Sequence, residues 1–223
     1  ANEPAIGTLV LKTSGDPQAV LACDAAMLAH RDHWFVRETI GLLRRTLQRL
    51  EVTSRSLFAV IGEGSCFAGS LFEVALAADR SYMLADGPRI GLGPLNFAGL
   101  EMANGRTRLA ARFNADRTGL AAGLRDAEAA LAEGLVTFAP DALDWEDEIR
   151  LAVEERASLS PDALSGMEAS LRFAGPETVA TKIFARLSAW QNWVFSRPNA
   201  TGETGALKRY GSGAKPKFDW ERV

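Results

Sequence analysis

The residues best suited to acid–base chemistry lie in the stretch "GEGSCFAGSLFEVALAADRSYML", which runs from Gly62 to Leu84. Within it, Glu73 stands where the apolar pattern predicts a helix that faces the core. A carboxylate there can accept and donate protons if a substrate comes within hydrogen-bond reach. It can equally stabilise the start of its own helix and pair with a cation such as Arg80. The residues alone leave both interpretations of Glu73 open.

Three further groups of side chains could bind a ligand or react. His30 and His33 are three residues apart, which suits two metal ligands on one helix face, but no other ligand type clusters nearby, so we expect no metal site. Cys66 follows a glycine turn without a histidine near it in sequence, which favours a small buried thiol over a nucleophile. Lys208 and Arg209 lie in a basic segment that either meets an anionic group or is simply solvated.

Composition excludes several classes of function. The chain has 223 residues with 28 acidic and 25 basic side chains, and a net charge of -3 gives no general field for nucleic acid. Two cysteines cannot form a disulfide framework, which favours the reducing cytoplasm. No apolar run approaches the roughly 20 residues that span a bilayer. We therefore expect a cytoplasmic protein that binds neither nucleic acid nor a membrane. The chain begins at Ala1 without a methionine, which fits either N-terminal processing or one piece of a longer polypeptide.

The elements that must position these residues alternate between strands and helices. Residues 6–13 predict a strand, and a helix follows whose apolar stripe consists of Val36, Ile40, Leu43, Leu47 and Leu50. In the run "SLFAVI", the residues on both alternating faces are mostly apolar, as in a strand that is covered on both faces. A glycine turn, a helix and the strand-like "RSYMLAD" come next. This order predicts crossover units on a mostly parallel sheet, and the pattern becomes helical from about residue 104 onward.

The order of motifs from Gly62 onward resembles the crotonase superfamily of enoyl-CoA hydratases and isomerases. The matching stretch is "VIGEGSCFAGSLFEVALAADRSYMLADGPRIGLGPLNFAG", and "DAEAALAEGLVTFAPDAL" is similar to a helix-to-strand segment of the same family. The resemblance can be followed along the whole chain. It implies a crotonase-like α/β fold, which we expect as a core over residues 1–140 followed by a helical region and an extended tail over residues 141–223. We expect the tail to dock, because the rings of Tyr210, Phe218 and Trp220 are costly to leave exposed to water.

A narrower likeness is to the C-terminal half of the benzoyl-CoA-dihydrodiol lyases, which carry two crotonase-like halves in one chain. It depends on motifs such as "LAADRSYML", "NGRTRLAARF", "AWQNWVFSRPNA" and "FDWERV". The likeness implies hydrolytic ring opening of 2,3-epoxybenzoyl-CoA to 3,4-dehydroadipyl-CoA semialdehyde and formate, in aerobic benzoate degradation. It implies an acyl-CoA substrate, an N-terminal crotonase-like half as partner and a homodimer, and no metal or other cofactor.

The resemblance also implies roles for particular residues. Glu73 matches one of the two acid–base glutamates, and the backbone N–H of Ser70 matches one arm of the oxyanion hole that binds the thioester carbonyl. In "LACDAAM", Cys23 or Asp24 stands where the family's other oxyanion arm has a glycine. Lys208 and Arg209 are the candidates for the CoA phosphates.

Two departures from the crotonase pattern bear on activity. Pro94 stands where the second acid–base glutamate would be, and a proline side chain cannot transfer a proton. Leu71 replaces a glycine of the oxyanion turn and hinders a close approach of substrate. We therefore expect a half that is structural or dimerising rather than catalytic. The alternatives are a self-sufficient enoyl-CoA isomerase or hydratase that uses Glu73 as its only base, and a non-catalytic interaction module.

Overall fold

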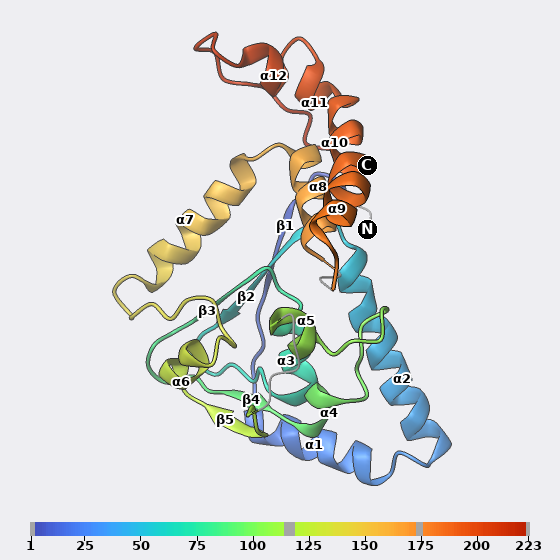
Figure 1. Ribbon diagram of the computed structural model, residues 1–223. Helices are drawn as coiled ribbons and strands as arrows, with labels where there is room; N and C mark the ends of the chain where they lie inside the picture. The colour runs from blue at the N-terminus through green and yellow to red at the C-terminus, as the bar shows by residue number, and fades with distance from the viewer. Residues whose placement is uncertain (1–2, 114–118, 173–175, 222–223) are drawn as a thin grey trace. The chain divides into compact units, whose positions relative to one another are not determined.

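The computed structural model describes residues 3–113, 119–172 and 176–221, and its contacts divide the chain into two compact units (Figure 1). The first unit contains residues 1–9, 53–56 and 153–223, and the second contains residues 10–52 and 57–152. The change from one unit to the other falls within helix α7, Trp145–Ser158. The expected division at residue 140 stays a prediction. Residues 1–2 and 222–223, at the ends of the two expected regions, lie outside the described residues.

The sheet of the chain has the order β1-β2-β3, with bounds Thr8–Leu11, Ser56–Ile61 and Arg80–Met83. Strands β2 and β3 are parallel and pair Phe58 with Arg80 and Ile61 with Met83. All six residues of β2 are buried, as its continuous apolar run predicts. Helix α3, Gly69–Leu76, connects the two parallel strands, so they form the expected crossover unit. A second, antiparallel pair joins β4, Ile90–Leu92, to β5, Gly123–Arg125.

Helix α3 lies at the centre of the second unit. It packs against α1 (Pro17–Ala29), α4 (Pro94–Phe97), α5 (Arg108–Phe113) and strand β4. The sequence dictates this position, because Phe72, Ala75 and Leu76 give the short helix apolar surface around its axis. Glu73 lies on the covered side of this helix and is therefore buried with its apolar neighbours.

Helices α2 and α6 also belong to the second unit. Helix α2, Trp34–Gln48, continues into the 3₁₀ turn Arg49–Val52. The predicted stripe is confirmed for Leu47, which is buried, and for Ile40, Leu43 and Leu50, which pack around it, whereas Val36 lines a separate cavity. Leu95 and Leu100 complete this cluster. Helix α6, Ala127–Ala132, follows β5 and is capped by Asp126, whose side chain accepts the backbone N–H of Ala129.

The first unit is mainly helical after α7. Its elements are α8 (Pro161–Leu171), α9 (Val179–Thr181), the π-helical turn Lys182–Leu187, α10 (Ser188–Phe195), α11 (Pro198–Thr201) and α12 (Ala206–Arg209). Glycine 166 of α8 packs against Trp190 of α10, which allows the two helices to approach closely.

The C-terminal tail is only partly docked. Asn199 and Asp219 exchange two hydrogen bonds, and Phe218 meets Trp220 edge to face. The expectation that Tyr210 is also buried is wrong, since its side chain is 91% exposed. The tail is held by hydrogen bonds of Asp219 with Asn199 and of Lys217 with Thr204, which do not involve the Tyr210 ring.

Candidate functional site

The N-terminus of helix α3 forms the first part of the candidate site. Ala68 precedes the helix and has no side-chain oxygen to cap it, so the first-turn amides need acceptors from elsewhere. Asp24 of α1 supplies one: its Oδ2 accepts the backbone N–H of Ser70 at 2.6 Å, and its Oδ1 accepts the Ser70 hydroxyl at 2.7 Å. The structure therefore brings Asp24 and Ser70 together, while their roles as oxyanion arms stay predictions. The Ser70 amide is bonded to the Asp24 carboxylate in this arrangement.

Gly69 makes this close approach possible. Its φ of +48° lies in the left-handed region, and a Cβ on it would stand 2.0 Å from Asp24 Oδ2. A side chain at this position would therefore collide with the carboxylate as well as strain the backbone. Burial raises the pKa of Asp24, and its two hydrogen bonds with Ser70 oppose this shift.

A cleft of about 440 Å³ opens beside this contact. Asp24 and Ser70 both line it, together with Cys23, Cys66 and Leu71. Leu71 is 36% exposed, so the bulky side chain that replaces a glycine of the crotonase pattern contributes to the wall of the cleft. Cys66 is 4% exposed, which fits the expectation of a small buried thiol. Glu73 is absent from the residues that line this cleft.

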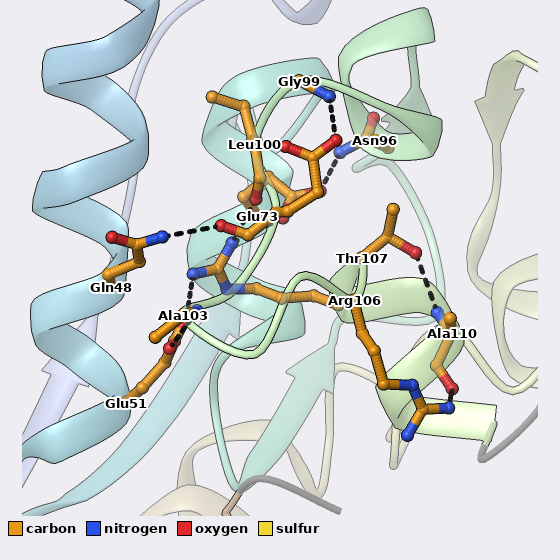
Figure 2. Close-up of polar contacts among 12 residues, drawn as sticks. Gln48, Glu51, Glu73, Asn96, Gly99, Leu100, Ala103, Arg106, Thr107 and Ala110 are labelled. Atoms are coloured by element: carbon orange, nitrogen blue, oxygen red, sulfur yellow. Dashed lines mark hydrogen bonds and ion pairs between the residues drawn. The ribbon is translucent and has the colours of Figure 1, made fainter. Parts of the chain in front are cut away.

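Glu73 lies instead in a buried polar network (Figure 2). Its Oε1 accepts a hydrogen bond from Asn96 Nδ2 at 2.7 Å, and its Oε2 pairs with Arg108 Nη1 at 3.0 Å. The side chain of Glu73 is 1% exposed. The expected partner Arg80 was the wrong cation, because Arg80 lies over the Phe58 ring and Arg108 of α5 reaches Glu73.

Arg108 connects Glu73 to a second buried carboxylate. Its Nη2 lies 2.6 Å from Glu51 Oε1, and its Nη1 also donates to the carbonyl of Leu100 at 2.9 Å. Glu51 Oε2 in turn accepts the backbone N–H of Ala103 (Figure 2). One buried arginine thus faces two buried carboxylates, which makes this network sensitive to the removal of any member.

Electrostatics leave Glu73 with an unusual proton affinity. Burial raises the pKa of Glu73 to about 7, against the opposing effects of the Asn96 hydrogen bond and the Arg108 charge. A pKa near 7 suits a general base, but the same contacts hold both oxygens of Glu73 on protein partners. The carboxylate can therefore take up a proton and still not reach a ligand in the cleft.

Sequence reasoning missed the residues that hold Glu73. Pro94 begins α4 as the first residue of the helix, and Asn96, two residues later, both contacts Glu73 and bonds to Gly69 and Gly93. The "NGRTRLAARF" motif contained Arg108, and an arginine beside apolar positions of a helix was the available signal. Only the fold places Glu51, Glu73 and Arg108 in contact.

The remaining predicted site residues lie elsewhere in the chain. Lys208 and Arg209 end helix α12 in the first unit, whereas Asp24, Ser70 and Glu73 belong to the second. Their role in binding CoA stays a prediction. His33 caps α2 through Nδ1, which accepts the N–H of Phe35, and both His33 and His30 line a separate cavity of about 370 Å³. Among the described residues, no group of three His, Cys, Asp or Glu side chains could hold a metal ion.

Comparison with curated proteins supports the narrower resemblance. No family model matches the chain. It is 57% identical, over 98% of its length, to benzoyl-CoA-dihydrodiol lyase from Aromatoleum evansii, and it spans 41% of that protein. The likeness to a part of this lyase is thereby confirmed, and the chain covers about two fifths of the relative's length.

Solved structures of enoyl-CoA hydratases have the same fold. The hydratase of Geobacillus kaustophilus HTA426 aligns with a TM-score of 0.67 and 19% identity, covering 83% of this chain and 69% of that one. An enoyl-CoA hydratase/isomerase of Cupriavidus metallidurans CH34 aligns with a TM-score of 0.64 and 21% identity, covering 94% and 78%. The expected crotonase-like α/β fold is confirmed. No helix of the described residues has the length and apolar character needed to cross a membrane.

Proposed function

We propose that this chain serves as a largely non-catalytic, crotonase-like half of a benzoyl-CoA-dihydrodiol lyase. The complete enzyme opens the ring of 2,3-epoxybenzoyl-CoA by hydrolysis and releases formate and 3,4-dehydroadipyl-CoA semialdehyde. In this proposal an N-terminal crotonase-like half performs the chemistry. The present chain supplies subunit packing and part of the substrate enclosure, in a cytoplasmic homodimer.

The observation that carries the proposal is the 57% identity along almost the whole chain to a part of the lyase. The local geometry supports a non-catalytic role for this part. The acid–base candidate Glu73 is held by Asn96 and Arg108 away from the cleft, and the Ser70 amide is held by Asp24. The two-carboxylate route for adding water also needs a second glutamate, and this chain has Pro94 where the crotonase pattern places that glutamate.

The pKa of Glu73 near 7 favours one competing function, an isomerase that moves a proton with a single carboxylate. Such an enzyme needs the carboxylate within about 3 Å of the substrate carbon's proton, directly or through one water. Glu73 is almost fully buried and does not line the cleft, so its release would require Arg108 and Asn96 to move. For this reason the non-catalytic role is the better-supported function.

The decisive experiment follows formate release from 2,3-epoxybenzoyl-CoA by the full two-half protein. In that protein we expect Glu73→Gln to leave kcat within about two-fold of the wild type, since the substituted group does not touch substrate. The 223-residue chain alone is the second arm, and no formate is expected from it. Formate from this chain alone, or loss of turnover in Glu73→Gln with the fold retained by circular dichroism, would overturn the proposal.

The proposed CoA contact and assembly have separate tests. Lys208 is exposed on α12, and if the basic segment meets the CoA phosphates, Lys208→Ala together with Arg209→Ala raises KM of the full protein without changing kcat. Unchanged KM would remove these residues from the CoA site. Sedimentation equilibrium of the full protein tests the homodimer, and a concentration-independent monomer would contradict it.

A further inference from the structure

The side chain of Asp24 lines the cleft and occupies the hydrogen-bond donors of Ser70 there. Its carboxylate is 1% exposed and reaches from α1 to the first turn of α3. There it accepts both polar hydrogens of Ser70, one from the backbone and one from the hydroxyl, at 2.6 and 2.7 Å. Burying a carboxylate is costly unless charge-assisted hydrogen bonds compensate it, so these two bonds are the local reason that Asp24 can stay buried.

The two donors of Ser70 are chemically suited to an acyl oxygen. A backbone N–H at a helix N-terminus that lies beside a cleft stabilises the negative oxygen of a carboxylate or of a thioester enolate equally well. The position that such an oxygen would occupy, at about 2.7–3.1 Å from the amide nitrogen, is the position that Asp24 Oδ2 now fills. An external ligand must therefore displace an internal one of like charge.

The surrounding backbone is adapted to Asp24 and not merely tolerant of it. Gly69 has a left-handed φ, and a Cβ there would meet both Oδ2 and Cγ of Asp24, at 2.0 and 3.1 Å. The absence of that Cβ leaves room for the aspartate side chain at the mouth of the helix. The glycine at position 69 and the aspartate at position 24 are therefore both needed for this contact.

We propose that Asp24 is an internal blocking group: its carboxylate occupies the Ser70 donors beside this cleft and so excludes acyl-CoA thioesters from them. This inference rests on the proposed function and deepens it, because it names the contact that silences the acyl site in this half. Removal of the Asp24 carboxylate frees the Ser70 amide and hydroxyl beside a cleft of about 440 Å³. These freed donors then bind the thioester oxygen that the wild-type protein excludes.

The test counts the binding sites for benzoyl-CoA in the full two-half protein. Isothermal titration gives the number of thioester molecules bound per chain in the wild type and in Asp24→Ala. We expect Asp24→Ala to bind one more equivalent than the wild type. The matched control is Asp16→Ala, which removes another carboxylate from the lining of the same cleft but leaves Ser70 bonded to Asp24.

Two further variants keep the test decisive. Asp24→Ser is a second opening variant in case Asp24→Ala does not fold, because a serine side chain is too short to span the same gap but can still be solvated. Asp24→Asn keeps an acceptor oxygen toward the Ser70 amide, so it is expected to stay closed. An unchanged number of sites in a folded opening variant, or an extra site in Asp16→Ala, overturns the proposal. Formate release is measured independently of this count, so a catalytic role of this half would be recognised separately.

Discussion

Arg108 holds two buried carboxylates at once, and replacing it with methionine is the most informative perturbation of the fold. Methionine has a similar length and fills the same apolar space, but it offers no hydrogen-bond donor. In Arg108→Met, Glu51 and Glu73 lose the cation that lies 2.6 and 3.0 Å from their oxygens. Leu100 also loses the hydrogen bond to its carbonyl.

The expected loss follows from the burial of the three side chains, all of which are at most 3% exposed. Breaking a buried pair by removing one partner costs about 3–5 kcal/mol, because the other charge stays desolvated. For a chain of this size each kcal/mol shifts Tm by about 2–4 °C, so a fall of roughly 6–20 °C is expected. Since the pKa of Glu73 is already about 7, that group can take up a proton, and the loss is smaller at pH 5.5 than at pH 8.

Urea unfolding and thermal melts at these two pH values measure the effect. Arg150→Met is the control, because Arg150 pairs with Asp147 on the surface and both side chains are more than half exposed. Its expected cost is below about 1 kcal/mol. The double variant Arg108→Met with Glu73→Gln should recover part of the loss, since it removes one of the two stranded charges.

A loss in Arg108→Met no larger than that in Arg150→Met would refute the reasoning. The two carboxylates would then be solvated or protonated without Arg108, and the network would not fix Glu73. A large loss that is independent of pH would also contradict the argument, because it would show that Glu73 is not the group that adapts.

Three other predictions follow from the same contacts. Burial raises the pKa of Glu73 from 4.5 to about 7, so the protonated form of Glu73 stabilises the folded state below pH 4.5. This contribution, about 3 kcal/mol at ~1.4 kcal/mol per pH unit, is lost as pH rises through 7. When the free energy of unfolding from urea titrations is plotted against pH across this window, Glu73→Gln should show a smaller slope than the wild type. Gly69→Ala should destabilise more than Gly64→Ala, which has a similar positive φ but nothing within 4 Å of the added Cβ and costs about 1–2 kcal/mol in thermal melts; equal costs would mean that Asp24 yields easily. Glu168→Ala should cost about 3–5 kcal/mol, because it leaves Arg156 and Arg172 without their buried carboxylate, and hydrogen exchange should increase first in α8; unaltered exchange there would contradict this.

The sequence predicted the local elements of the second unit well. The stripe around Leu47 and the continuous apolar run of β2 depend on periodicity, which is a property of neighbouring residues. The resemblance named Asp24 and Ser70 separately as candidate oxyanion arms, and these roles stay predictions; the hydrogen bond between the two residues is a finding of the structure. Tyr210 was wrongly expected to be buried, because the cost of exposing an aromatic ring does not reveal whether a surface is available to cover it.

By itself, the sequence determined the parallel crossover unit and the position of Glu73 on a core-facing helix. That Pro94 stands where the crotonase pattern has a second acid–base glutamate stays an implication of the resemblance. Only the tertiary structure decided what each polar group faces. Arg108 is 35 residues from Glu73 and Asp24 is 46 residues from Ser70, so no local pattern encodes these contacts. They arise because α1, α4 and α5 all pack on α3, and a polar group buried by that packing must find its partner among the helices that cover it.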